Sequence, residues 1–434
     1  MVYFKVSQNI NIKTTDGSLV KYHKAPPGVS SDDFIYCSTY NDFLDLKSVF
    51  SRVDKKYQIK VLLEERILSS HIMPIELGIT NKFEYQTLKK IDYRMKKNLY
   101  VEKSLEHKIK EVSFSEDGFD FYEQIKHCIK LDISLAIIGG VGRNIGEIIS
   151  SCSALRILHE ELKNKFPSVK LDIYLESSEN KYYSRDKELL LTQGFIHKIE
   201  PLSLSLKKLL SYDFIIDTSL LNKRTYFSHM PYVDAYLYKF GIDYEKVNKL
   251  RKSTFIDRIS ASLHKNLIKK IKDLKKVGKL LLFHPYSANE DRSIPKEFAI
   301  KYMKKLIRTA DDYSIVSALN IVELHDDRYV NLANMSKSLS EFIYIISQAD
   351  KIITVDTSTY HIADAFFVPT LVLFTDDKAN IRTKYYQQTK TIEIEDKTKN
   401  YSTFTFENPS LELYKHQAWK DLKISKVMKL LETI

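Results

Sequence analysis

Short apolar runs alternate with helical patterns between residues 134 and 260. The apolar runs are "SLAIIGG" from residue 134, "VKLDIYLE" from residue 169 and "YDFIIDTS" from residue 212. Between the first two runs, apolar residues recur every three or four positions, at Ile148, Cys152, Leu155, Leu158, Leu162 and Phe166. That spacing places one apolar stripe of a helix against a sheet, and Pro167 marks the end of the helix. The alternation predicts βαβ units and a parallel sheet.

A second series of the same kind follows residue 278. Four apolar runs predict strands, at 279–287, 313–319, 351–355 and 370–375, and the segments between them predict helices at 295–310, 339–349 and 358–367. Pro295 suits the first turn of the first of these helices. The tail at 411–434 predicts one or two closing helices. The chain therefore contains two α/β halves in tandem.

Residues 1–130 follow a different pattern. Apolar and polar residues alternate around Asp16-Gly17, which predicts a hairpin. A breaker, "APPGVSSDD", then precedes a predicted strand, helix and strand. We predict an amino-terminal accessory domain of uncertain fold at 1–130, a Rossmann-like domain at 131–260, and a Rossmann-like domain with closing helices at 261–434.

Composition places the chain among globular proteins. It has 434 residues, of which 44% are hydrophobic and 28% charged, enough for two or three domains. The beginning of the chain lacks the features of a secretory signal, and no run of about 18 apolar residues occurs. Cys37, Cys128 and Cys152 are too widely spaced for a disulfide framework or a thiolate metal site. We expect a cytoplasmic protein.

The formal charge of +11 predicts an anionic partner. Nucleic acid, an acidic lipid surface and a phosphorylated small molecule all satisfy that charge. The densest basic run, "HKNLIKKIKDLKKVGK" at 264–279, has helical spacing, and it fits either a solvated helix face or contact with an anionic membrane. Since no nucleic-acid module is recognisable, we expect no nucleic-acid partner.

Four of the eleven glycines lie in one turn, at Gly139, Gly140, Gly142 and Gly146. A strand that ends in glycines and leads into a helix allows a polar or anionic ligand to approach backbone N–H groups, but tight strand-to-helix packing explains the glycines equally. Gly142, Asn144 and Gly146 are candidates for a cleft loop. The adjacent Glu147 is either a favourable charge in the first helical turn or a general base facing the cleft.

A second polar cluster follows the predicted strand at 351–355. Asp356 ends the strand, Thr357, Ser358 and Thr359 begin a helix, and His361 lies in its first turn. Hydroxyl groups, backbone donors and an imidazole thus converge on a point that suits a diphosphate. The alternative is an ordinary helix cap with a surface histidine.

A third candidate segment is the polar loop after the strand at 279–287. The strand runs into this loop, which contains Ser287, Asn289 and Arg292 and precedes a helix. Arg292 is able to neutralise a phosphate through two parallel hydrogen bonds, although a loop arginine is more often solvated.

Together these segments resemble glycosyltransferase family 9, the heptosyltransferase-like enzymes of the two-domain GT-B fold. "GEIISSCSALRILHEELKNKFPSVKLDIYL" resembles the family's opening segment, and "DTSTYHIADAFFVPTLVLF" resembles its D-[ST]-G-x-x-H-x-A block. "FHPYS" and "RSIPKEF" occupy the places of two further family elements. The resemblance covers about 134–380 and departs from the family at Glu147, usually Asp, and at Ser358, usually Gly. The segment 1–130 has no counterpart in the lipopolysaccharide-core enzymes.

The resemblance implies that the two Rossmann-like domains, at 131–260 and 261–434, are an acceptor domain and a nucleotide-sugar domain that face each other across a cleft. It also implies an inverting, metal-independent transfer of a sugar such as a heptose. The donor would be a nucleotide-diphosphate sugar, with no other cofactor, and the acceptor a glycan, a lipid or a protein. Glu147 would be the general base. The helix beginning at Thr357 to Thr359, with Ser287, Arg292 and His361, would bind the diphosphate, and Asp356 the sugar hydroxyls.

Two alternatives remain open at this point. A GT-B-like shell without turnover would serve as a sugar-nucleotide or partner-binding protein, and Ser358 in the place of glycine favours it. A nucleotide-sugar epimerase would share the same architecture, because a fold does not determine its chemistry.

Overall fold

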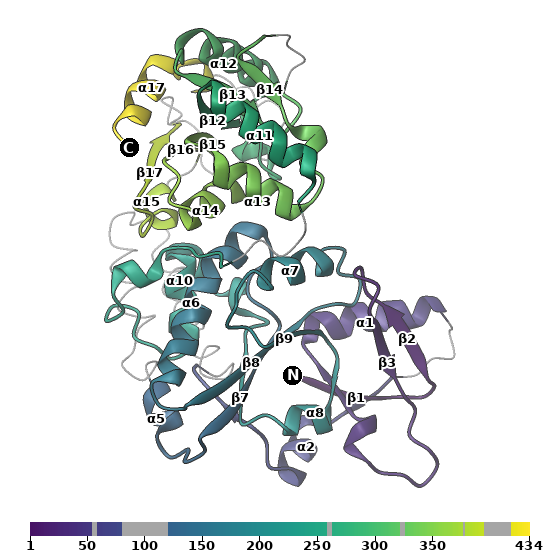
Figure 1. Ribbon diagram of the computed structural model, residues 1–434. Helices are drawn as coiled ribbons and strands as arrows, with labels where there is room; N and C mark the ends of the chain where they lie inside the picture. The colour runs from purple at the N-terminus through teal and green to yellow at the C-terminus, as the bar shows by residue number, and fades with distance from the viewer. Residues whose placement is uncertain (54–58, 80–119, 258–262, 322–325, 376–377, 395–417) are drawn as a thin grey trace, which may run out of the picture. The chain divides into compact units, whose positions relative to one another are not determined.

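The computed structural model describes residues 1–53, 59–79, 120–257, 263–321, 326–375, 378–394 and 418–434 (Figure 1). Contacts within the chain divide it into two units. The first consists of residues 1–143 and 151–252, and the second of residues 144–150 and 253–434. A short segment at the start of one long helix therefore belongs by its contacts to the second unit.

The first unit contains a five-stranded parallel sheet. Its strands, in spatial order, are β6 (Ile75–Glu76), β11 (Phe214–Asp217), β7 (Asp132–Ile138), β8 (Ser168–Leu175) and β9 (Lys198–Pro201). The helices of this part of the chain are α5 (Phe121–Lys126), α6 (Ile145–Lys163), α7 (Tyr183–Leu190), α8 (Leu206–Leu210), α9 (Thr225–His229) and α10 (Tyr232–Lys239). The strand order reverses at β7, because β8 and β9 lie on one side of it and β11 on the other. Such a reversal is where ligands bind in doubly wound sheets, beyond the carboxyl ends of the strands.

The beginning of the chain builds a second sheet of the first unit. This antiparallel sheet has the order β10 (Leu204–Ser205), β4 (Tyr36–Ser38), β1 (Val2–Val6) and β5 (Ile59–Leu62). Its associated elements are the hairpin β2 (Ile10–Lys13) and β3 (Leu19–Tyr22), and the helices α1 (Tyr40–Val53) and α2 (Glu64–Ser70). The hairpin predicted around Asp16-Gly17 is confirmed.

The two sheets of the first unit exchange strands. β6 comes from the segment 1–130 and pairs with β11 of the parallel sheet. β10 comes from the α/β part and pairs with β4 of the antiparallel sheet. The amino-terminal segment is thus joined to the parallel sheet by backbone hydrogen bonds at two places. The predicted domain boundaries stay a prediction.

The second unit contains a six-stranded parallel sheet. Its strands, in spatial order, are β14 (Tyr329–Asn331), β13 (Tyr313–Ser317), β12 (Lys279–His284), β15 (Lys351–Val355), β16 (Thr370–Phe374) and β17 (Thr389–Glu393). Its helices are α11 (Lys265–Val277), α12 (Lys296–Thr309), α13 (Leu339–Gln348), α14 (Ser358–Ala365), α15 (Ala379–Arg382) and α17 (Ile424–Glu432). The order reverses between β12 and β15, so the loops that follow these two strands flank the expected ligand position.

The apolar periodicities predicted these elements correctly. The strands β12, β13, β15 and β16 and the helices between them lie where the patterns place them, and their apolar residues are buried. Trp419, the one tryptophan of the chain, is buried in the core that α12 and α17 share with the sheet of the second unit. The prediction of an α/β protein with two parallel sheets is confirmed. The cleft predicted between the two halves stays a prediction.

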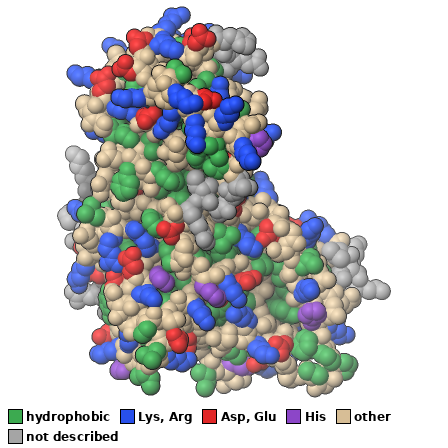
Figure 2. Space-filling view, in the orientation of Figure 1, with side chains coloured by type: hydrophobic (Ala, Val, Ile, Leu, Met, Phe, Trp, Pro, Cys, Tyr) green, Lys and Arg blue, Asp and Glu red, His purple; other side chains and the backbone are tan. Residues whose placement is uncertain are grey.

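Charged side chains are spread over the surface. Lys and Arg side chains on the face shown in Figure 2 are mixed with Asp and Glu over both units. Within the residues described above, no helix is both long and apolar enough to cross a membrane.

Candidate active site

The loop after β12 is held together by its own hydrogen bonds. Ile294 donates its backbone N–H to the Pro285 carbonyl at 2.9 Å, and Ser287 donates its N–H to Ser293 Oγ at 2.9 Å. Asn289 caps a short 3₁₀ helix, Glu290–Arg292, by accepting the Asp291 N–H at 3.0 Å. This ordered turn presents Arg292 at the carboxyl end of the sheet.

Asp356, the first residue after β15, meets Arg292. Arg292 Nη1 donates to one carboxylate oxygen of Asp356 at 2.9 Å, and the Tyr360 hydroxyl donates to the other at 3.0 Å. The Asp356 side chain is only 11% exposed, whereas that of Arg292 is 37% exposed. Asp356 therefore fixes a guanidinium group that still reaches solvent at the strand ends. The structure brings these two predicted residues together.

Helix α14 begins without a side-chain cap. Thr357 is the N-cap residue in extended geometry, and its side chain makes no capping hydrogen bond. The first-turn N–H groups consequently receive no acceptor from Thr357, and they carry the positive end of the helix dipole. Ser358 is half-buried in this turn, and Thr359 is fully buried with a hydroxyl that has no hydrogen-bond partner among the described residues. The alternative of an ordinary capped helix does not describe this terminus.

His361 is buried, so the alternative of a surface histidine is wrong. Its Nδ1 lies 2.5 Å from the Tyr386 hydroxyl and 2.9 Å from Ser150 Oγ, and these two hydroxyls lie 2.8 Å apart. Burial lowers the pKa of His361 to about 3, and the positive charges of Arg382 and Arg292 act in the same direction. The imidazole is therefore neutral near pH 7. It is able to form hydrogen bonds, but it carries no positive charge for a diphosphate.

The first turn of α6 packs against His361 within the second unit. Gly146 is buried, and a Cβ atom built on it would lie 2.4 Å from His361 Cδ2 and 2.8 Å from Nε2. Close packing therefore explains this glycine. Asn144 Oδ1 accepts the Glu147 N–H at 2.9 Å, so Asn144 caps the helix and Glu147 follows half-buried in its first turn.

Backbone geometry explains the remaining glycines of the turn, which belong to the first unit. Gly139, Gly140 and Gly142 have φ angles of +98°, +74° and +94°, which side-chain-bearing residues rarely adopt. A Cβ atom on Gly139 would also lie 2.8 Å from the Ser219 Cα. Backbone geometry and close packing thus account for these glycines, and the approach of a ligand to the backbone N–H groups of the turn stays a prediction.

Several residues of this site were not among the candidates predicted from the sequence. Tyr360 follows Asp356 by one helical turn, a spacing that could have revealed the contact. Asp364 accepts the Thr254 N–H at 2.9 Å and its hydroxyl at 2.8 Å, which anchors α14, and burial raises the pKa of Asp364 to about 6. Arg382 and Tyr386 lie in or after α15, where no periodic pattern marks them.

No metal site is apparent in this part of the protein. Among the described residues, no group of three or more His, Cys, Asp or Glu side chains is placed to hold a metal ion.

A family model matches part of the second unit. The sequence model of glycosyltransferase family 9 (heptosyltransferase) matches residues 305–414, which include the Asp356–Ala363 block. No curated protein sequence matches the chain.

Solved structures of similar architecture have low sequence identity to this chain. A glycosyl transferase family 9 protein from Veillonella parvula DSM 2008 is 13% identical, with 70% of this chain and 98% of that chain covered and a TM-score of 0.48. The E. coli ADP-heptose lps heptosyltransferase II is 14% identical, with 66% and 98% covered and a TM-score of 0.42. The iron-containing dodecameric glycosyltransferase TibC from enterotoxigenic E. coli H10407 is 11% identical, with 60% and 64% covered and a TM-score of 0.35.

Residues 305–414 carry the glycosyltransferase family 9 (heptosyltransferase) match, which confirms the resemblance predicted from the sequence and with it the prediction of a glycosyltransferase.

Proposed function

We propose that the chain is an inverting glycosyltransferase that takes a sugar, such as a heptose, from a nucleotide-diphosphate donor and transfers it to a hydroxyl acceptor. One observation carries the proposal. The family match covers the strand end where the uncapped start of α14 lies beside Asp356 and its bound Arg292. That arrangement offers backbone N–H groups and a cation to an anion in the place where doubly wound sheets bind ligands.

The donor diphosphate would lie at the start of α14. Its leaving group gains negative charge as the glycosidic bond breaks, and the first-turn N–H groups and Arg292 would stabilise that charge. Arg382 supplies a second positive charge near His361. Asp356 would orient Arg292 through the 2.9 Å ion pair, in addition to the contact with sugar hydroxyls that the resemblance implies. Neutral His361 would contribute a hydrogen bond or packing.

Glu147 would act as the general base. Gly146, directly before it, touches His361 of α14 within the second unit, so the turn that carries Glu147 lies against the helix at the donor site. Glu147 would accept the proton of the acceptor hydroxyl as that oxygen attacks the anomeric carbon from the face opposite the diphosphate. A single displacement of this kind inverts the anomeric configuration and forms no covalent intermediate.

Metal independence is part of the proposal. Arg292, Arg382 and the helix terminus provide the positive charge that a cation would otherwise supply at the diphosphate. TibC is called iron-containing, so addition and removal of iron belong in the test.

The acceptor and the place of action are also proposals. A glycan, a lipid or a protein would supply the hydroxyl group, in the cytoplasm. The basic surface of α11, with Leu267, Ile271 and Leu274 buried beneath it, would allow contact with an anionic membrane.

Calorimetric titration with ADP-heptose and with other nucleotide sugars tests the donor site. We expect one class of donor to bind, with Arg292→Gln lowering its affinity about tenfold or more, because a charge-assisted contact is lost. Arg308→Gln, which removes an exposed arginine of α12, is the matched control and should bind as the wild type does. A chain that binds no nucleotide sugar would refute the proposal.

The catalytic assignment needs a second measurement, the release of ADP in the presence and absence of acceptors and of iron or a chelator. Glu147→Gln should abolish transfer and leave donor affinity unchanged. If the wild type binds the donor without turnover, and Ser358→Gly restores turnover, the result would point to the binding-protein alternative. If product analysis without an acceptor finds that the sugar of the donor has been epimerised, the result would point to an epimerase.

A further inference from the structure

The beginning of the chain forms hydrogen bonds with the loop that follows β8. Asp42, in the first turn of α1, accepts the backbone N–H groups of Ser177 and Ser178 at 2.9 and 2.8 Å. The Ser38 hydroxyl donates to its other oxygen at 2.7 Å. Asp42 is fully buried, so three hydrogen bonds replace its lost hydration. Two consecutive residues of the β8–α7 loop are therefore fixed by a side chain from another part of the sequence.

Thr39 fixes the residue that precedes these two. Its hydroxyl donates to Glu176 Oε1 at 2.9 Å, while the same oxygen accepts the Asp42 N–H at 3.1 Å. Glu176 directly follows the last residue of β8 and is half-buried. The start of α1 thus sets both the backbone of this loop and the direction of the Glu176 carboxylate.

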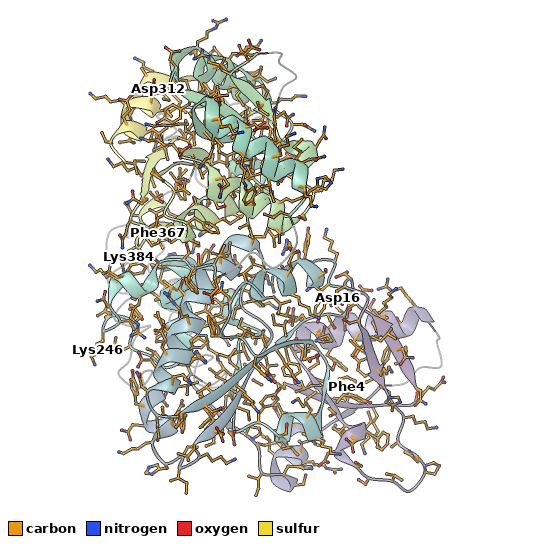
Figure 3. All side chains as sticks on the ribbon, in the orientation of Figure 1. Phe4, Asp16, Lys246, Asp312, Phe367 and Lys384 are labelled. Carbon is orange, nitrogen blue, oxygen red and sulfur yellow. The ribbon has the colours of Figure 1, made fainter. Side chains whose placement is uncertain are left out.

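Two further contacts hold α7, the helix that follows the loop. Thr15 Oγ1 accepts the Ser184 N–H at 2.9 Å, and Lys187 pairs with Asp16 at 2.8 Å. Figure 3 places Asp16 at the tip of the β2–β3 hairpin, toward α7. Two separate elements within the segment 1–53, α1 and the β2–β3 hairpin, therefore contact the β8–α7 loop and α7.

A fifth contact lies in the middle of the loop. Arg52, from the last turn of α1, forms an ion pair with Glu179. Glu179 has a φ angle of +57°, a conformation that residues other than glycine seldom adopt without support from their surroundings. Contacts from the segment 1–53 thus fix residues 176–179 of the loop and the helix that follows it.

This loop lies beside the glycine turn at the carboxyl end of the parallel sheet. Gly140 packs on Leu175, the residue before Glu176, so closely that a Cβ atom would lie 2.7 Å from a Leu175 methyl group. Arg185 Nη2 donates to the Arg143 carbonyl at 3.3 Å, which links α7 to the same turn. The held carboxylate therefore lies at the edge where this sheet reverses its strand order, the expected ligand position of the first unit.

We infer that residues 1–53 form a positioning device for the acceptor half of the reaction, which holds the β8–α7 loop so that Glu176 binds a hydroxyl group of the acceptor. The inference rests on the proposed glycosyl transfer. Glu176 accepts a hydrogen bond from the acceptor and takes no proton in the reaction, and Thr39 acts through Glu176. Burial raises the pKa of Glu176, whereas Thr39 and the charge of Arg143 favour its ionised form.

Thr39→Val and Glu176→Gln test this inference in the full chain. ADP release from ADP-heptose is followed with methyl α-glucoside, methyl α-mannoside and a serine-containing peptide as acceptor probes. We expect each variant to raise the acceptor KM about tenfold or more, through loss of a hydrogen bond to a charged group, and to leave the calorimetric affinity for ADP-heptose unchanged. Thr39→Ser keeps the hydroxyl and should restore the wild-type KM.

Asp33→Asn is the matched control. Asp33 also links the segment 1–53 to the α/β part, but its ion pair, at 3.0 Å, is with Lys207 of α8 and not with a residue of the β8–α7 loop. It should leave the acceptor KM unchanged. An acceptor KM that does not respond to Thr39→Val, or that responds equally to Asp33→Asn, overturns the inference.

Hydrogen exchange separates this inference from the proposed function. Thr39→Val should speed exchange of the amides of residues 176–182 about tenfold, with strands β7 and β8 unchanged, because one anchor of the loop is lost. Unchanged exchange in the loop overturns the positioning role. A wild-type chain that binds ADP-heptose but transfers to no probe counts against the acceptor role of Glu176. Failure to bind any nucleotide sugar counts against the proposed function instead.

Discussion

Replacement of Gly146 by alanine tests the packing of α6 on His361. The added Cβ atom would lie 2.4 Å from His361 Cδ2, well inside van der Waals contact. The imidazole has little freedom to withdraw, because its Nδ1 is within hydrogen-bond distance of both Ser150 and Tyr386. We therefore expect the substitution to strain the second unit, although alanine is normally the better helix former.

The expected magnitude follows from two opposing effects. Forcing a methyl group into a filled site costs about 1–3 kcal/mol, and alanine in place of glycine inside a helix gains about 0.5–1 kcal/mol. Gly146 is the second residue of α6, so the gain lies at the lower end. The clash is larger, and Gly146→Ala should lower the free energy of unfolding by about 1–2 kcal/mol.

Tryptophan fluorescence during urea unfolding measures this loss. Trp419 is the one tryptophan in the sequence and lies in the core of the second unit, so its signal reports the unit that contains Gly146. At a slope of about 2 kcal/mol/M, the midpoint should fall by about 0.5–1 M urea. The control is Gly278→Ala, where the nearest atom would lie 3.6 Å from the new Cβ, and it should leave the midpoint nearly unchanged.

A wild-type midpoint for Gly146→Ala would refute the contact. The His361→Ala background provides a second check, because removal of the imidazole frees the space that the methyl group needs. In that background Gly146→Ala should be neutral or stabilising. An equal loss in both backgrounds would show that the strain lies elsewhere.

Two further predictions concern the buried groups around His361. Its folded-state pKa of about 3 lies below the value of about 6.5 expected on unfolding, so the unfolded chain alone binds this proton as the pH falls below 6.5, and stability decreases. His284, with a pKa lowered to about 4 by burial, acts in the same direction, while Asp364 opposes both below pH 6. The Trp419-monitored urea midpoint should be lower at pH 5 than at pH 7.5, and His361→Gln should reduce this difference; a midpoint independent of pH would contradict the buried neutral imidazole. Tyr386→Phe removes a hydroxyl 2.5 Å from His361 Nδ1 and 2.8 Å from Ser150, and should cost about 1–2 kcal/mol in the same assay, whereas an unchanged midpoint would show that the hydroxyl is dispensable.

Local periodicity was enough to predict most secondary structure. The sequence predicted the strand at Lys351–Val355 and the helix that follows it. A buried parallel strand is a short continuous apolar run, and such a run is recognised without knowledge of the strands that pair with it. Strands β6 and β10 were missed, since each has only two residues and exists through its pairing with a distant strand. The strand pairing that joins the beginning of the chain to the α/β part was therefore not predicted from the sequence.

The candidate site divides in the same way. Asp356 and Thr357 were predicted because polar residues directly after a buried strand lie at one edge of a parallel sheet, and Arg292 because it lies in the polar loop that follows another strand of the same sheet. The pairing of Arg292 with Asp356 joins residues 64 positions apart, and no local pattern encodes it. The hydrogen bond from Thr39 to Glu176 joins residues 137 positions apart and was likewise not predicted.

The sequence by itself determined most of the strands and helices and their order along the chain, and also the family match, because both depend on local spacing and residue type. Tertiary structure decided the state of His361. The ring is neutral because Gly146 and Ser150, more than 200 positions earlier, close around it and exclude water. A pKa depends on what surrounds a group in space, and those surroundings exist only once distant segments pack together.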